Sequence, residues 1–140
     1  MRWLWIAILS GSLYGADLAT IGQEPNLERR SQLAMDFASG ALDAARKQYQ
    51  DGETGKADAA LTEVGASVDL AYQSLLETHK EARRDPKFFK RAELSTRQLL
   101  RRIEGLAEAM SFDDRRMAEM VRDRVAAIHE NLLEAIMKKK

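Results

Sequence analysis

A long apolar stripe near the middle of the chain constrains the fold more than any other feature. Between Ala57 and Ala82 apolar residues recur every three or four positions, and Thr78 is the one polar interruption. This spacing predicts an α-helix with one apolar side, which we expect to continue to about Arg84. The stripe consists of Ala57, Leu61, Val64, Val68, Ala71, Leu75 and Ala82. Such a helix is stable in water only when its apolar side packs against other helices.

Three further segments have the same spacing and supply those helices. The first begins at Pro25, the second follows Asp85-Pro86, and the third follows Ser111. Their expected inward residues are Leu27, Ala34, Phe37, Ala38, Ala41, Ala45 and Tyr49; then Phe89, Ala92, Thr96, Leu99, Ile103, Leu106 and Met110; then Met117, Val121, Val125, Ile128, Leu132 and Ala135 or Ile136. Together the four segments predict an all-α fold, an antiparallel four-helix bundle with up-down-up-down topology. A pair of long helical hairpins that completes its core as a homodimer is the open alternative.

The expected breaks between these helices carry residues typical of turns and caps. Gly52 suits the left-handed position after the first helix, and Thr54 suits the start of the second. Asp85 is expected to cap the third helix and Ser111 the fourth. Small alanine side chains in the first two helices should let those two pack closely.

The first 16 residues have the organisation of a secretory signal peptide. Arg2 gives a positive start, residues 3–9 form a short apolar run, and small residues follow it. The run is shorter than the roughly 20 residues of a membrane-spanning helix. The expected organisation is a signal peptide at 1–16, a flexible leader at 17–24 and a helical bundle domain at 25–140. An uncleaved membrane tether, or a strand or helix of the core, is the alternative interpretation of the first segment.

Composition excludes several classes of function. The chain has no cysteine, which removes disulfides, thiolate metal sites and thiol catalysis. Its 22 Lys and Arg residues balance its 22 Asp and Glu residues, so no net charge directs the chain to nucleic acid or to membranes. No serine stands in the context of a nucleophile elbow. We therefore expect no catalytic activity, no bound cofactor and no nucleic-acid partner.

Charge is distributed unevenly along the chain. From Lys80 to Arg102 there are nine basic and three acidic residues, whereas acidic residues are in excess from Glu24 to Asp69. Such a segment suits docking to an anionic partner, lipid headgroup or polymer. The expected contact residues are Lys87, Lys90, Arg91, Arg97 and Arg101. The alternative is a solvated face whose cations pair with acids on neighbouring helices.

The two histidines, His79 and His129, suggest a second class of function. Met35 in the first helix and His129 in the fourth are expected at similar depths, and a Met/His pair is a known axial ligation for haem. A b-type haem-binding electron carrier is therefore the alternative function. A carboxylate metal site is not expected, because neither histidine has a Glu three residues before it.

The sequence thus predicts a small exported helical bundle without catalysis. We expect it to work in the periplasm or outside the cell as a binding or scaffolding module of the cell envelope. Its partner is expected to be a protein or an anionic envelope component.

Overall fold

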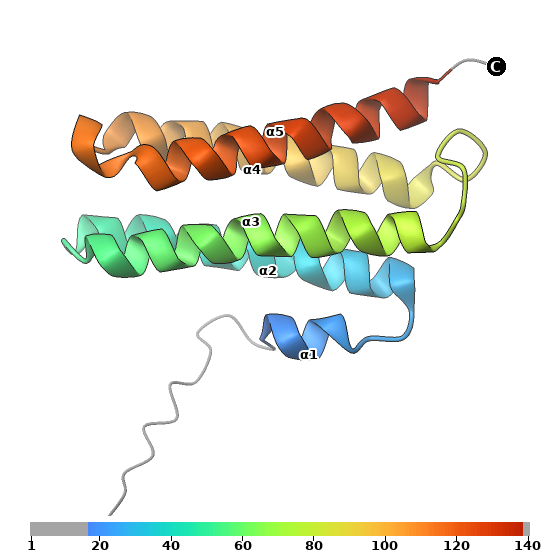
Figure 1. The fold of residues 1–140 in the computed structure, drawn as a ribbon, viewed down its shortest axis with the longest axis horizontal. Coiled ribbons are helices and arrows are strands. Elements are labelled where there is room, and N and C mark those ends of the chain that lie inside the picture. The colour runs from blue at the N-terminus through green and yellow to red at the C-terminus, as the bar shows by residue number, and fades with distance from the viewer. Residues whose placement is uncertain (1–16, 139–140) are drawn as a thin grey trace, which may run out of the picture.

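Five α-helices and one short 3-10 helix form the structure, a computed structural model that describes residues 17–138. The elements are α1 (Leu18–Gly22), α2 (Leu27–Gln50), α3 (Thr54–Glu77), α4 (Lys87–Ala109), η1 (Phe112–Asp114) and α5 (Arg116–Met137). No strand occurs between residues 17 and 138. The four long helices lie side by side, and their directions alternate along the chain (Figure 1). The all-α, up-down-up-down bundle is therefore confirmed, while the expected signal peptide at 1–16 lies outside the described residues.

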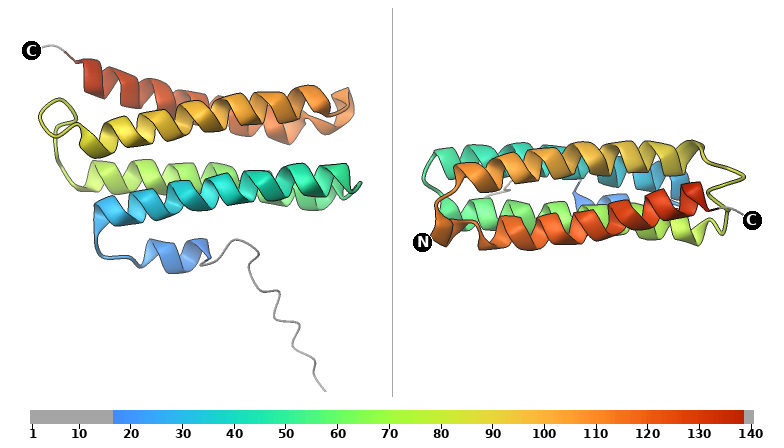
Figure 2. Two further views of the ribbon diagram at one scale, coloured as in Figure 1. Left: turned by 180° about the vertical axis from the view of Figure 1, so that it is seen from behind. Right: turned by 90° about the horizontal axis from the view of Figure 1, so that it is seen from above.

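The bundle consists of two stacked helical hairpins. Helices α2 and α3 form one hairpin, and α4 and α5 form the other. Helix α3 packs against α5 and α2 against α4, so the 78–86 loop crosses the bundle diagonally (Figure 2). Helices are antiparallel within each hairpin but parallel between the hairpins, since α2 and α4 start at the same end.

The apolar stripes form a single core between the hairpins. Every inward residue expected for the third helix is buried, and all but the C-cap residue Met110 lie within α4: Phe89, Ala92, Thr96, Leu99, Ile103, Leu106 and Met110. On α3 the expected stripe is buried from Ala57 to Leu75. The hydroxyl of Thr96, the one polar member on α4, donates to the Ala92 carbonyl at 3.0 Å. A buried threonine is therefore tolerated, because its hydroxyl has a partner within its own helix.

Helix α3 ends at Glu77 instead of continuing to Arg84. The Thr78 hydroxyl donates to the Leu75 carbonyl at 2.6 Å and accepts from the Lys80 amide at 3.2 Å, which turns the chain locally. His79 follows with φ at 56°, a left-handed conformation that ends the helix. Ala82 is buried as predicted, but it lies in the 78–86 loop and not on a helix.

Residues 17–24, expected to be a flexible leader, contain the helix α1. The Asp17 side chain caps it by accepting a hydrogen bond from the Thr20 amide at 2.8 Å, which lowers the pKa of the Asp17 carboxyl group. Ile21 is buried against the bundle. Arg30 on α2 donates to the Gly22 carbonyl at 3.3 Å, so polar contacts also hold α1 in place.

The expected turn residues are partly correct. Gly52 has φ at 79°, the left-handed conformation predicted for it. The N-caps of α3 and α4 are Glu53 and Pro86 instead of Thr54 and Asp85, and neither makes a side-chain capping bond. Ser111 precedes η1, also without a side-chain capping bond, and its amide donates to the hydroxyl of Tyr49 at 3.0 Å. The turn before η1 is therefore held by a contact to α2 and not by a local side-chain cap.

Within residues 17–138, no helix is both long enough and apolar enough to cross a lipid bilayer.

Close packing of α2 on α3 can be tested at Ala41, which is fully buried in a stripe of small side chains on α2. Ala41→Leu is expected to lower the free energy of unfolding by about 1–3 kcal/mol, because added methylenes must displace packed neighbours. The measurement is urea unfolding followed by circular dichroism. Ala59→Leu, at an exposed position of α3, is the control and should change stability by less than about 0.5 kcal/mol. Equal effects at both sites would contradict the close packing.

Candidate anion-binding surface

The side of α4 that faces away from the core carries the expected contact residues. Because the core stripe of α4 repeats at helical spacing, the residues between its members project outward. The α4 outer face is defined here as Lys87, Lys90, Arg91, Leu94, Arg97 and Arg101, all of which are exposed. It extends roughly 21 Å along the helix at 1.5 Å per residue. The fold therefore places the five predicted cations on one continuous surface.

Several neighbouring cations pair with acids, as the alternative interpretation expected. Lys80 Nζ donates to the carboxylate of Glu28 on α2, and this hydrogen bond raises the pKa of Lys80. Arg102 donates to Asp43 and, at 2.8 Å, to the hydroxyl of Ser39. These contacts join α2 to the 78–86 loop and to α4. They are part of the scaffold, and none of these cations belongs to the α4 outer face.

Arg97 is the one cation of the α4 outer face with an acidic partner. Its Nε lies 3.3 Å from Glu93 Oε1, one helical turn earlier. The same carboxylate oxygen lies 3.1 Å from His129 Nε2 on α5. The Glu93 side chain is 14% exposed, so its charge is directed toward the α4–α5 interface and away from the outer face.

The other four cations have no carboxylate within 4.0 Å among residues 17–138. Lys90 and Arg101 make no hydrogen bond or ion pair to the described part of the chain. Lys87 and Arg91 lie over the ring of Phe88, at 5.4 and 5.8 Å from its centroid. A cation over an aromatic face keeps its full charge. The surface is thus positively charged and not internally neutralised.

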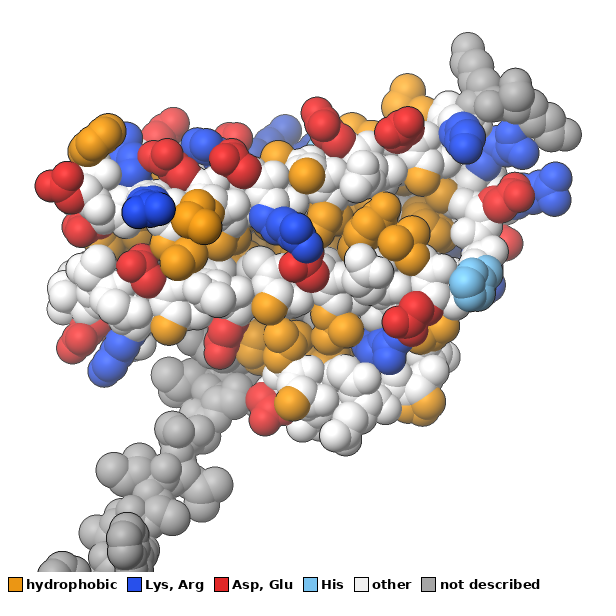
Figure 3. Space-filling view, in the orientation of Figure 1, with side chains coloured by type: hydrophobic (Ala, Val, Ile, Leu, Met, Phe, Trp, Pro, Cys, Tyr) orange, Lys and Arg blue, Asp and Glu red, His pale blue; other side chains and the backbone are white. Residues whose placement is uncertain are grey.

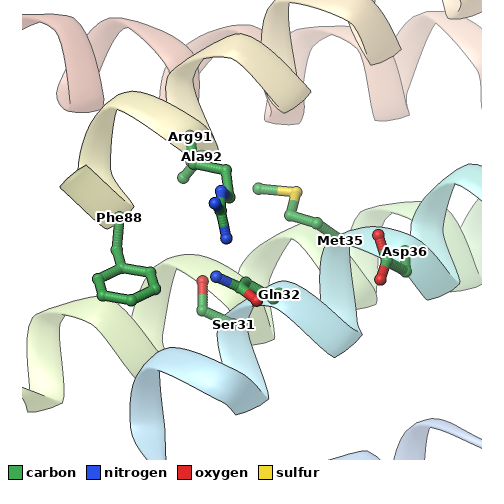
Figure 4. A pocket seen from close by; sticks show the side chains of 7 residues that line it. All are labelled: Ser31, Gln32, Met35, Asp36, Phe88, Arg91 and Ala92. Carbon is green, nitrogen blue, oxygen red and sulfur yellow. The ribbon is translucent and has the colours of Figure 1, made fainter.

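A groove follows the seam between α2 and α4, beside this face. It contains three adjoining hollows of about 210, 430 and 490 Å³. Met35 lies in its floor, and Asp36 lines all three hollows. In Figure 4 the guanidinium of Arg91 extends from α4 toward α2, while Phe88 lies at one end. Cations of α4 therefore form one edge of the groove.

The opposite face of the bundle has a different character. A hollow of about 520 Å³ lies where α3, α5 and the 78–86 loop meet, and its apolar floor includes Leu76 and Phe89. Figure 3 shows hydrophobic side chains gathered between α3 and α5 toward this end. Of its rim cations, Lys80 is paired with Glu28, and Arg83 lies 3.8 Å from Glu81. The third rim cation, Lys138, has no acidic partner among residues 17–138, so this hollow has one such cation where the α4 outer face has four.

The structure places Met35 and His129, the expected haem ligands, in two different seams. Met35 lies between α2 and α4, and His129 lies between α5 and α4 with Nε2 facing Glu93. None of the five hollows described has both residues on its wall. No group of three or more His, Cys, Asp or Glu residues among those described could hold a metal ion.

Two residues of this region were not singled out from the sequence. Leu94 is 46% exposed in the middle of the α4 outer face, and Phe88 is half-buried beside Lys87 and Arg91. Leu94 was recognisable in principle, because it lies two positions after the core residue Ala92 and outside the stripe.

No protein family, curated protein or solved structure matches the chain.

Added haemin should produce no sharp Soret band, since Met35 and His129 lie in separate seams and Glu93 faces the imidazole. The measurement is an absorbance titration of the purified protein, with free haemin in the same buffer as the reference. A Soret band that appears in the native chain and disappears in His129→Ala would instead support the haem-binding alternative.

Proposed function

We propose that this chain is a small exported helical bundle that acts without catalysis as a binding or scaffolding module of the cell envelope. Its partner is an anionic component, which it contacts through the α4 outer face. The observation that carries the proposal is the set of four exposed cations there without an acidic partner: Lys87, Lys90, Arg91 and Arg101.

The arrangement of these charges supports binding to an extended anion. A single exposed ion pair contributes little free energy to binding. Here an incoming anion meets cations at successive turns of one helix, and no existing salt bridge of Lys90 or Arg101 has to break. Several weak contacts along about 21 Å then add together. A multivalent partner is therefore favoured over a single small anion.

The proposed location outside the cytoplasm rests on residues 1–16, whose positive start and short apolar run are typical of an exported chain. Export would bring the α4 outer face to the periplasm or the exterior, where envelope polymers and lipid headgroups are available as anionic partners.

Export can be tested by expressing the full chain in a bacterial host and fractionating the cells. The expected result is a soluble periplasmic product whose intact mass lacks the first 15 or 16 residues. Full-length protein in the membrane fraction would indicate a tethered bundle instead. Full-length protein in the cytosol would contradict export.

The contact surface can be tested with inorganic polyphosphate as the anionic probe. A fourfold variant replaces Lys90, Arg91, Arg97 and Arg101 with Gln. It should bind polyphosphate at least about tenfold more weakly, because four positive charges are removed from one surface. Its remaining binding should also depend less steeply on salt. The measurement is the dissociation constant at several salt concentrations.

A matched variant controls for the change in net charge. Replacing the exposed residues Arg46, Lys47, Lys56 and Arg116 with Gln removes the same charge from the other end of the bundle. This control should retain most of the binding. Equal losses in both variants would show that net charge, and not the α4 outer face, determines binding.

A further inference from the structure

We propose that the anionic partner is the headgroup surface of an acidic phospholipid bilayer, on which α4 lies lengthwise with Leu94 inserted. This inference rests on the proposed function, and it selects one partner from the anionic components named there. It is carried by Leu94, the exposed apolar residue within the α4 outer face, which a soluble polymer would leave without an apolar contact.

Leu94 is the central observation. Its side chain is 46% exposed and lies between the cations Lys90 and Arg97, one turn of helix from each. Helices that bind the membrane interface combine lysine and arginine with apolar residues, and Leu94 supplies an exposed apolar residue among these cations. The cations can contact headgroup phosphates while Leu94 reaches the acyl boundary below them.

Phe88 lies beside the start of this face, in the groove between α2 and α4. Its half-buried ring has Lys87 and Arg91 within 6 Å of its centroid. Aromatic rings are favoured at the headgroup level of a bilayer, where an apolar body can lie beside charged groups. The two residues are six positions apart, about 120° around the helix, so Phe88 lies at the edge of this face toward the α2 seam, and insertion is assigned to Leu94 alone.

The acidic groups around this face neutralise only part of its positive charge. Glu93, the one acidic residue of α4 between Lys87 and Arg102, is directed toward His129 and Arg97. Across the seam, the α2 carboxylate of Asp43 is engaged by Arg102. Asp36 is the one carboxylate on the groove walls without a cation within 4.0 Å. The four cations of α4 that lack acidic partners outnumber it.

The shape of the molecule permits this approach. From behind, α2 and α4 lie side by side along the length of the bundle (Figure 2, left). The loop 78–86 lies at the end of the bundle and not across this side. A flat surface can therefore meet α4 along its whole exposed face.

A single fluorescent label can test the docking, because the chain contains no cysteine. Leu94→Cys carries an environment-sensitive dye at the proposed insertion point. Met120→Cys, at another exposed apolar position on α5, carries the same dye as the control. Both proteins are mixed with vesicles of phosphatidylglycerol and phosphatidylcholine, or of phosphatidylcholine alone.

The expected result is a blue shift of the dye at position 94 with acidic vesicles only. The shift should decrease with added salt and disappear in the Lys90, Arg91, Arg97 and Arg101 glutamine background. The unlabelled variant Leu94→Ser, with the native helix content, should bind acidic vesicles about fivefold more weakly, since about half of one leucine side chain is no longer buried.

Other outcomes overturn the inference in distinguishable ways. Polyphosphate binding that requires the α4 cations, without a shift at position 94, would leave the proposed function intact and exclude the bilayer. Binding to neither probe would exclude both. Equal shifts at positions 94 and 120, or a shift with neutral vesicles, would show that membrane contact does not occur through the charged face.

Discussion

Burial of the apolar stripes between two helical hairpins is the interaction on which the rest of this structure depends. Each long helix has one apolar side, so none of them is stable alone in water. Stacking α2–α3 on α4–α5 buries the central part of all four stripes in one core. Some predicted inward residues near the helix ends are only half-buried: Leu27, Tyr49, Met117, Ala135 and Ile136. On α4 the strict spacing of that core has a second effect, since it leaves the side of the helix farthest from the stripe, which carries the α4 outer face, toward solvent. The cationic face is thus a consequence of how the core is patterned.

Hydrophobic spacing predicted the architecture because it reports which side of each helix is buried. It failed where a local polar contact or a tertiary contact decides the outcome. Ala82 continued the spacing of α3, but the Thr78 hydroxyl and the left-handed His79 end that helix earlier. The five residues of α1 are too few to show periodicity, and Ile21 is buried only because the bundle is already present.

The location of the candidate surface was predictable from the sequence. Which of its cations have acidic partners was not. Counting basic residues treats Lys80, Arg102 and Lys90 alike, whereas the fold pairs the first two and leaves Lys90 without an acidic partner. Which cation meets an acid depends on α2 lying beside α4, and that arrangement follows from the diagonal course of the 78–86 loop. Sequence spacing does not specify which helices become neighbours across the hairpins. Leu94 could be interpreted as part of a binding surface only once most of the cations around it were found to lack acidic partners.

The parallel alignment of α2 and α4 has an electrostatic consequence of its own. Each helix carries a macrodipole equivalent to roughly half a positive charge at its N-terminus. In a bundle whose neighbours are all antiparallel these partial charges alternate, but here two of them lie together on one side. They coincide with the end of α4 that bears Lys87, Lys90 and Arg91. The two N-termini therefore add to the positive charge of this face at one end only, within the first turn of α4.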